Sequence, residues 1–187
     1  MKTHTACFIG HRTINETEEL KSKIIEIIEK LIVDENVDTF LFGSKSRFNS
    51  LCQEAVTKMK EKHPHIKRIY VRAEYPYISD DYKKYLLENY EDTYYPERII
   101  GSGKAVYVER NCEMIDKSDI CIFYYDDRIA SKMHKSGTKT AVEYALNQNK
   151  HVIKLSLWLN NKLPSAPLTY KKPPISLKRT FLNLWVI

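Results

Sequence analysis

Glycine is scarce in this sequence, and long apolar runs are missing. No run approaches the roughly 20 consecutive apolar residues that a helix needs to cross a bilayer, so no membrane contact is expected. The first residues run directly into a predicted strand and leave no room for a signal peptide, which favours a cytoplasmic location. Hydrophobic residues are 43% and charged residues 29% of the 187 positions, a balance typical of one soluble globular domain.

Closely spaced cysteine pairs are also missing. The four cysteines are Cys7, Cys52, Cys112 and Cys121, and none of them forms a C-x-x-C motif. Two fall inside apolar strand-like runs, so we interpret the four as buried thiols in a reducing compartment. The pattern predicts neither disulfides nor a metal site, and no cofactor is expected.

Acidic residues are absent from the last part of the chain. From Leu155 to the end there is no Asp or Glu, whereas five Lys or Arg and four Pro occur there. Subtracting those five charges from the net charge of +6 leaves about +1 for the first 154 residues. We therefore predict a domain at 1–154 and a basic, proline-containing tail at 155–187. Because the basic charge lies mostly in the tail, nucleic acid is disfavoured as a partner of the domain.

Apolar residues alternate between strand-like and helix-like spacing along the first part of the chain. Strands are predicted at 5–9, 38–42 and 66–71, and helices at 16–33 and 47–60. Asn15 with Glu18 three residues later resembles a capping box at the start of the first helix. This alternation predicts an α/β fold with a mainly parallel sheet, doubly wound, with flanking helices.

Residues 74–100 interrupt that alternation. Ser79 or Asp80 is expected to cap a short helix there, and tyrosines cluster around two prolines. Tyr75 and Tyr77 directly follow a predicted strand, where their rings either stack on a base or simply pack against the sheet. The alternation then resumes, with a strand at 120–124, a helical segment at 140–145 and a last strand at 150–155.

Three of the five glycines, Gly10, Gly43 and Gly137, lie where a strand is followed by a helix. Ligands of open parallel sheets bind beyond the carboxyl ends of the strands, so we expect these junctions to converge on one site. Small and hydroxyl residues at 136–138 leave free N–H groups at a helix N-terminus, which favours phosphate. The plainer alternative is that these glycines only permit turns.

Cationic side chains occur at the same junctions. Arg12, after the first strand, is expected to reach the rim of the sheet, where a guanidinium binds phosphate through two hydrogen bonds. Tyr107, Arg110 and Asn111 share one side of a predicted helix and together offer a ring, a cation and an amide. Two alternatives stay open: Arg110 forms an ion pair with an acid of its own helix (Glu113 or Asp116), and Glu143 pairs with Lys139.

At these residues the chain resembles the SLOG superfamily, named for Smf/DprA and LOG proteins, and is similar to its YpsA-type branch. The resembling segments are CFIGHR, FLFGSKSRFNSLCQEAV, YVERNCEMIDKSDICIFYYDD and KSGTKTAVEYA, within residues 5–153. The resemblance implies a Rossmann-like fold, binding of a nucleotide-derived ligand, and a homodimer.

LOG enzymes of this superfamily cleave the base–ribose bond of nucleoside monophosphates with an arginine and with the glutamate of a P-G-G-x-G-T-x-x-E signature. Aligning Gly137 with the second glycine places Thr140 on the threonine and Glu143 on the glutamate, and Arg110 matches the arginine. If the chain is an enzyme, the resemblance implies that Arg110 and Glu143 are catalytic. The full set of predicted ligand-binding residues is Gly10, His11, Arg12, Gly43, Ser44, Tyr107, Arg110, Asn111, Ser136, Gly137, Thr138, Thr140 and Glu143.

Three functions are compatible with this sequence. The first is binding of a nucleotide or an ADP-ribose-like signalling ligand, as a sensor or by sequestering it. The second is a LOG-like N-glycosidase, a phosphoribohydrolase of nucleoside monophosphates. The third is single-stranded DNA binding as in DprA, which the nearly neutral domain disfavours because such binding needs a basic groove.

Overall fold

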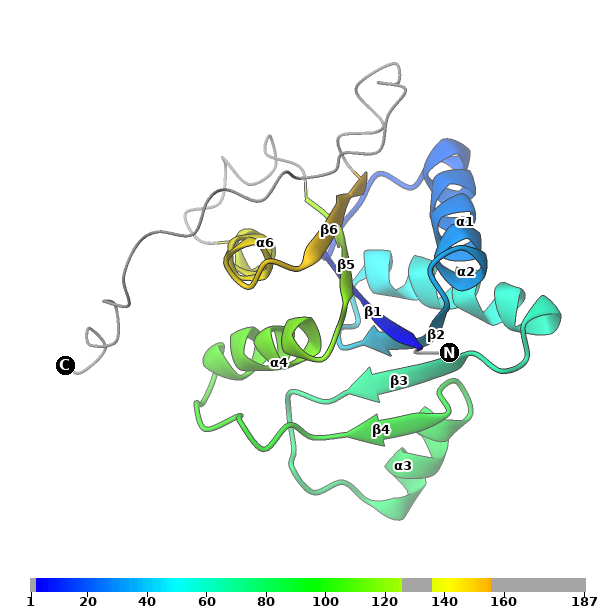
Figure 1. Cartoon of the computed structure of the whole chain (residues 1–187). Coiled ribbons are helices and arrows are strands. Elements are labelled where there is room, and N and C mark those ends of the chain that lie inside the picture. Colours follow the sequence, from blue (N-terminus) through cyan, green and yellow to red (C-terminus); the bar gives the residue numbers. More distant parts are fainter. Residues whose placement is uncertain (1–2, 126–135, 156–187) are drawn as a thin grey trace.

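The structure is a computed structural model that describes residues 3–125 and 136–155. Its centre is a six-stranded sheet in the order β4-β3-β2-β1-β5-β6, and every neighbouring pair is parallel (Figure 1). The strands are β1 (His4–Gly10), β2 (Val37–Phe42), β3 (Lys67–Val71), β4 (Asp92–Tyr94), β5 (Ile120–Tyr124) and β6 (His151–Lys154). The predicted α/β, Rossmann-like fold is therefore confirmed.

Helices cover both faces of the sheet. Among the described residues they are α1 (Glu18–Val33), α2 (Arg47–Lys62), α3 (Asp80–Leu87), α4 (Ala105–Asp116) and α6 (Gly137–Asn147). Helices α1 and α2 lie on one face and α4 and α6 on the other, while α3 lies near the β4 edge (Figure 1). Each of these helices is too short or too polar to cross a lipid bilayer.

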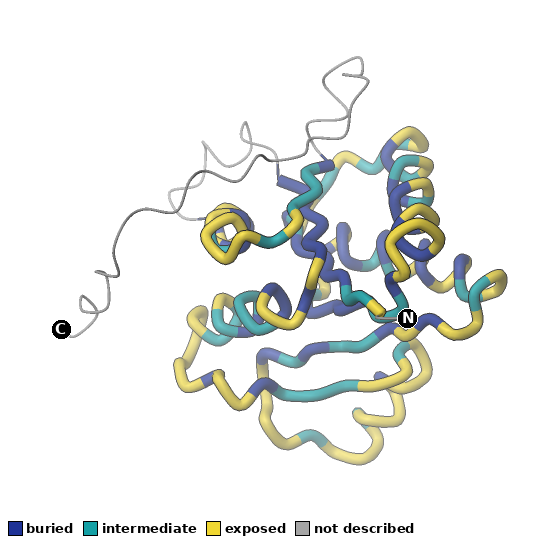
Figure 2. Tube along the Cα trace, viewed as in Figure 1, coloured by how far each residue is buried: buried dark blue, intermediate teal, exposed yellow. Residues whose placement is uncertain are grey.

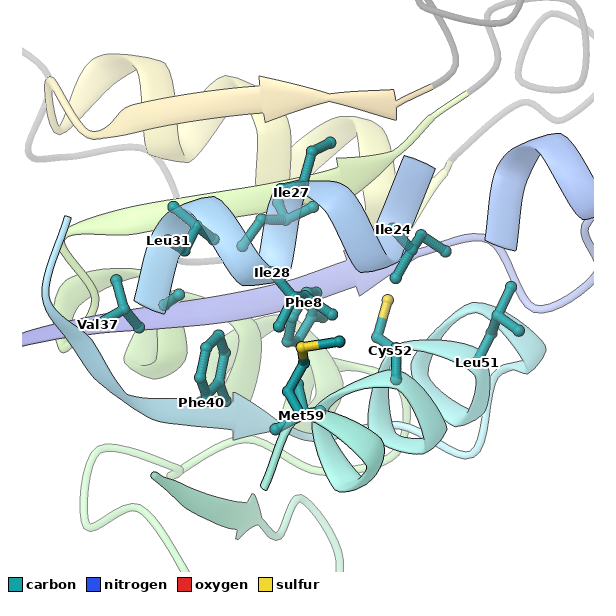
Figure 3. Close-up of a cluster of buried hydrophobic side chains, with 14 of the residues drawn as sticks. Phe8, Ile24, Ile27, Ile28, Leu31, Val37, Phe40, Leu51, Cys52 and Met59 are labelled. Atoms are coloured by element: carbon teal, nitrogen blue, oxygen red, sulfur yellow. The ribbon is translucent and has the colours of Figure 1, made fainter. Parts of the chain in front are cut away.

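Two apolar cores result, because successive strand side chains point to opposite faces. Phe8 of β1 points toward α1 and α2, where Phe40, Ile24 and Ile28 surround it (Figure 3). Cys7, the preceding residue, belongs to the second core, beneath α4 and α6. Figure 2 shows the same division, with buried residues concentrated in the central strands and on the inner sides of the helices. Cys52 and Cys121 are buried as well, as expected of thiols, whereas Cys112 is partly exposed.

Helix α1 begins two residues later than the capping-box pattern suggests. Its N-cap is Thr17, whose Oγ1 accepts a hydrogen bond from Leu20 N at 3.2 Å, so the prediction of Asn15 as the cap is wrong. The physical reason is that Glu16 is held outside the helix by Arg47 of α2, whose Nη2 donates to Glu16 Oε1 at 2.7 Å. Thr17 is then the residue that can satisfy the free N–H groups of the first turn.

The sheet order creates a switch point between β1 and β5. The chain passes from β1 through β2 and β3 to β4 on one side and then returns to β5 on the other side. Residues 74–100 thus contain a strand of the sheet, because β4 pairs with β3. In parallel sheets of this kind, the crevice beyond the carboxyl ends of the strands beside the switch point is the usual ligand site.

Two parts of the sequence prediction lie outside the described residues. These are the loop at 126–135 and the proposed tail at 155–187, of which only Leu155 is described, as a buried residue.

Candidate functional site

The site forms where α4 crosses the carboxyl ends of β2 and β3. Gly43 directly follows β2, and a Cβ atom added to it would lie 2.7 Å from Cδ and Nε of Arg110 and 2.5 Å from Sδ of Met114. Such distances are shorter than van der Waals contact allows, so a glycine is needed where the arginine side chain passes. The structure thereby brings together the predicted site residues Gly43 and Arg110.

Arg110 is almost fully buried, with 3% of its surface exposed. Its Nε donates to Asn111 Oδ1 at 3.0 Å, and its Nη1 donates to the Val71 carbonyl at 3.5 Å. A guanidinium has five N–H donors, so three are left without an acceptor among the described residues. A buried guanidinium normally has a carboxylate partner.

The acids of α4 do not supply that partner. Glu113 forms its ion pair with Lys117, at 2.9 Å, and Asp116 pairs with Arg98. Within the described residues, no carboxylate lies within ion-pair distance of Arg110. The alternative of an ion pair inside the helix is therefore excluded for Arg110.

The surroundings of Arg110 disfavour its charge. Burial lowers the pKa of Arg110 to about 10, and the nearby Tyr70 and Glu74 offset only part of this effect. The guanidinium still carries its proton at neutral pH, because a pKa of about 10 lies well above 7. An anion beside it would restore the stabilisation that burial removes.

The loop after β3 contributes two site residues that the sequence analysis missed. Glu74 accepts a hydrogen bond from the hydroxyl of Tyr107 on α4, so this loop is joined to the helix that carries Arg110. Arg72 donates from Nη1 to the carbonyl of Tyr75, at 2.9 Å. Both residues lie directly beyond a strand end, and that position could have indicated them.

At the β2–α2 junction, the backbone amides that could bind a ligand already have hydrogen-bond partners within the protein. Asn49 of α2 is buried, and its Oδ1 accepts hydrogen bonds from Gly43 N at 3.2 Å and Ser44 N at 3.4 Å. Its Nδ2 donates to the Phe8 carbonyl of β1 at 3.2 Å. The hydroxyl of Ser44 lies 2.8 Å from that of Ser46, the N-cap of α2. The backbone amides at 43 and 44 therefore serve the junction itself.

The β1 junction has a buried part and an exposed part. Gly10 is required because a Cβ there would lie 2.4 Å from Cδ1 of Phe48. His11 is buried, and its backbone N–H donates to the Tyr124 carbonyl at 3.3 Å. Arg12 is exposed, and its carbonyl accepts a hydrogen bond from Arg47 N at 3.0 Å. A cationic side chain thus follows the strand that borders the switch point.

The start of α6 is capped by a serine side chain. Ser136 is the N-cap, and its Oγ accepts a hydrogen bond from Lys139 N at 3.4 Å. Gly137 is exposed with open space around it, Thr138 is buried, and the Thr140 hydroxyl donates back to the Ser136 carbonyl at 3.4 Å.

Glu143 lies farther along α6. Its side chain is 61% exposed, and Lys139 Nζ lies 4.0 Å away. The side chains whose charges act on Arg110 are Tyr70 and Glu74, and Glu143 is not one of them. Arg110 thus contacts Asn111 and Gly43, and Tyr107 is linked to it through Glu74. The described contacts do not connect Glu143 to this group.

A separate hollow of about 420 Å³ lies at the opposite end of the sheet, where β3 and β4 begin. Lys60, one of its cations, donates to the Ile66 carbonyl at 2.7 Å and lies 3.4 Å from Glu91. Because this charge is already compensated by the protein, the hollow is a weaker candidate than the Arg110 site.

Comparison with known proteins gives two findings. The chain is 30% identical over 149 residues to the uncharacterized SPbeta prophage-derived protein YoqJ of Bacillus subtilis (strain 168), covering 68% of this chain and 80% of YoqJ. No model of a known protein family matches the sequence.

The second finding is a solved structure, DNA processing protein A of Helicobacter pylori, which was studied for its single-stranded DNA binding mode. It is similar to this chain with a TM-score of 0.52 and 18% identity, over 81% of this chain. The chain spans 64% of that protein, less than two thirds, and at this identity the similarity establishes the fold alone.

Proposed function

The chain belongs to the family of the prophage protein YoqJ, and we propose that its Arg110 site binds the phosphate of a nucleotide-derived small molecule. The observation that supports this is a buried guanidinium with unused donors and, among the described residues, no carboxylate within ion-pair distance. The charge of Glu74 acts on it from farther away. Binding without turnover would make the protein a sensor of the ligand or a protein that sequesters it.

Phosphate is an anion that suits this site. A guanidinium presents parallel N–H donors that match two phosphate oxygens, and hydrogen bonds between two charged groups are about twice as strong as neutral ones. Gly43 leaves room for the arginine at the strand end, and Arg12 adds an exposed cation beyond β1. The N-terminus of α6, at Ser136 and Gly137, is proposed to add N–H donors for the same ligand.

The fold similarity to DNA processing protein A is compatible with membership of the SLOG superfamily. The YpsA-type branch and a homodimer remain proposals that rest on the resembling motifs.

The direct test measures binding of adenosine 5′-monophosphate and of ribose 5-phosphate to the full chain by calorimetry. Arg110→Met should abolish the binding of both, because the side chain keeps an unbranched apolar stem and loses its donors. Arg98→Met is the matched control, since Arg98 already pairs with Asp116, and it should bind as the wild type does. Equal binding by wild type and Arg110→Met would place the ligand elsewhere.

A second candidate is single-stranded DNA binding, which the fold similarity to DNA processing protein A favours. This function requires several phosphate contacts, so the affinity for oligothymidylate should fall steeply with salt. Binding of the mononucleotide with little salt dependence, and no binding of oligothymidylate, would exclude it.

The hydrolase alternative assigns catalysis to Arg110 and Glu143. It predicts release of free base from a nucleoside monophosphate, with loss of turnover but not of binding in Glu143→Gln. Glu74→Gln belongs in the same assay, because Glu74 is the carboxylate whose charge acts on Arg110. Return of intact nucleotide after denaturation would favour binding over hydrolysis.

A further inference from the structure

Two tyrosine rings beyond the end of β3 are almost fully exposed. The exposed fraction is 68% for Tyr75 and 93% for Tyr77. Other tyrosines of this region pack on one another: the rings of Tyr82 and Tyr85 stack at 6.1 Å, and Tyr70 lies 5.2 Å from Tyr90. Neither Tyr75 nor Tyr77 contacts another aromatic ring of the described residues. Apolar ring surface is thus left open to solvent in a region that is otherwise rich in ring contacts.

The backbone that carries these rings is held in an unfavourable conformation. Tyr75 has φ +57°, in the left-handed region that bulky residues rarely adopt. Arg72 holds it there, because its Nη1 donates both to the Tyr75 carbonyl at 2.9 Å and to the Pro76 carbonyl at 3.2 Å. Nε of Arg72 is buried without an acceptor among the described residues. Backbone strain of this kind is unfavourable and is concentrated at binding and catalytic sites.

This segment, the Arg72–Tyr77 loop, lies beside the Arg110 site. Glu74, next to Tyr75, accepts the hydrogen bond of the Tyr107 hydroxyl, and Tyr107 lies one helical turn before Arg110 on α4. Arg110 also donates to the carbonyl of Val71, the residue that precedes the loop. The loop is therefore joined to Arg110 through the residue before it and to Tyr107 of α4 through its centre.

We propose that the Arg72–Tyr77 loop is the platform on which a nucleobase stacks when the phosphate of the same nucleotide binds Arg110. This inference rests on the proposed function and narrows the ligand to a nucleoside phosphate, as opposed to a phosphorylated sugar alone. A tyrosine ring offers a flat apolar face to a base, and stacking of one base on an aromatic side chain is worth about 1–3 kcal/mol. Every base has such a face, so the platform selects for a base and not for its identity.

The test compares two probes, adenosine 5′-monophosphate and ribose 5-phosphate, on the full chain by calorimetry. Replacing both rings, in Tyr75→Ala/Tyr77→Ala, should lower the affinity for the nucleotide by about ten- to a hundredfold. The affinity for ribose 5-phosphate should stay unchanged, because it has no base to stack. Tyr85→Ala removes an exposed tyrosine of α3 and is the matched control, and Tyr75→Phe/Tyr77→Phe should retain nucleotide affinity because the rings remain.

A spectroscopic measurement reports the stacking itself. The fluorescence of 2-aminopurine riboside 5′-monophosphate is quenched when its base stacks on an aromatic ring. The wild type and the double Phe variant should quench it, and the double Ala variant should not.

The outcomes separate the two proposals. If Arg110→Met abolishes binding of both probes while the double Ala variant binds the nucleotide as tightly as the wild type, the platform is refuted and the phosphate site stands. If the wild type binds neither probe, both proposals fail. A third outcome would overturn the inference. If the wild type binds oligothymidylate but not the mononucleotide, and the double Ala variant loses the binding of oligothymidylate, the rings serve a nucleic acid strand.

Discussion

Arg68 and Arg110 are the two arginines buried among the described residues, and they lie at opposite ends of strand β3. Arg68, at the start of the strand, donates through Nη2 to Glu91 Oε1 at 2.7 Å and through Nη1 to the Thr57 hydroxyl at 2.7 Å. Arg110, at the other end, has an amide and one distant carbonyl as acceptors.

This difference in partners distinguishes Arg68, whose charge supports the structure, from Arg110, whose charge we propose is available to a ligand. Glu91 also accepts a hydrogen bond from Arg68 N at 2.6 Å, so the carboxylate joins β4 to the start of β3. The protein itself compensates the charge of Arg68. In the described part of the chain no carboxylate lies within ion-pair distance of Arg110, and Glu74 offsets only part of the effect of burial. Folding therefore holds this charge at a cost that a ligand can offset.

The largest loss of stability is expected on replacing Arg68, whose charge the protein compensates. Arg68→Met leaves the partly exposed Glu91 carboxylate with only the more distant Lys60 as a cationic neighbour, and it removes the buried member of the pair, which is destabilising. The free energy of unfolding in urea should fall by about 3 kcal/mol. The control is Lys62→Met, which removes a surface cation at the end of α2 and should change the free energy of unfolding little. Equal stability of Arg68→Met and wild type would break the distinction between the two arginines.

Replacing Arg110 is expected to change the free energy of unfolding in the opposite direction, toward higher stability. Its pKa is about 10 in the folded protein, below the ordinary 12.5, so folding disfavours the protonated form at neutral pH. Arg110→Met should therefore raise the free energy of unfolding by up to about 3 kcal/mol while phosphate binding is lost. Adding adenosine 5′-monophosphate should raise the Tm of the wild type alone. A less stable Arg110→Met variant would indicate that this arginine is structural as well.

Asn49 tests whether position at the carboxyl edge alone makes a polar group available to a ligand. It lies close to Gly43, yet both ends of its amide are bound. Asn49→Asp replaces the donor to the Phe8 carbonyl by an oxygen that repels it, and should lower the free energy of unfolding by about 1–3 kcal/mol. Asn49→Asp with unchanged stability would show that the junction does not depend on this amide.

The smallest expected effect is on how stability depends on pH, and it arises from the Arg68–Glu91 pair. Burial alone would raise the pKa of Glu91, but the hydrogen bonds from Arg68 outweigh it and hold the pKa at about 2. A depressed carboxyl pKa stabilises the folded state above the unfolded value of about 4.5, and this stabilisation is lost as the pH falls toward 2. Thermal unfolding between pH 5 and pH 2 should thus show a shallower loss of Tm in Arg68→Met than in wild type. Parallel curves would contradict the assigned role of Glu91.

Much of the fold could be predicted because the apolar spacing in the first half of the chain is regular. The strand predicted at 38–42 and the helix predicted at 47–60 correspond to β2 and α2 within two residues. Strand β4 was missed because it has only three residues, none of them fully buried, and its place at the sheet edge requires no apolar run. Glu74 was missed for a related reason, since it lies in the segment interpreted as an interruption.

The position of Arg110 at the carboxyl edge of the sheet could be predicted, but the lack of a carboxylate at ion-pair distance among the described residues could not. Whether an arginine on a helix pairs with the acids beside it depends on which other cations reach those acids. Here Lys117 pairs with Glu113, and Arg98 approaches Asp116 from a segment before the helix. The Glu113–Lys117 pair has i,i+4 spacing, which the sequence shows, whereas the approach of Arg98 to Asp116 is set by tertiary packing, which local spacing does not encode.

The missing side chain at Gly43 also constrains how this site can diverge. A methyl group there would occupy the space through which the Arg110 side chain runs. Relatives that keep the arginine should keep the glycine, and relatives that gain a side chain at position 43 should have replaced the arginine. The two positions, 67 residues apart in the chain, are thus expected to covary as one inherited unit.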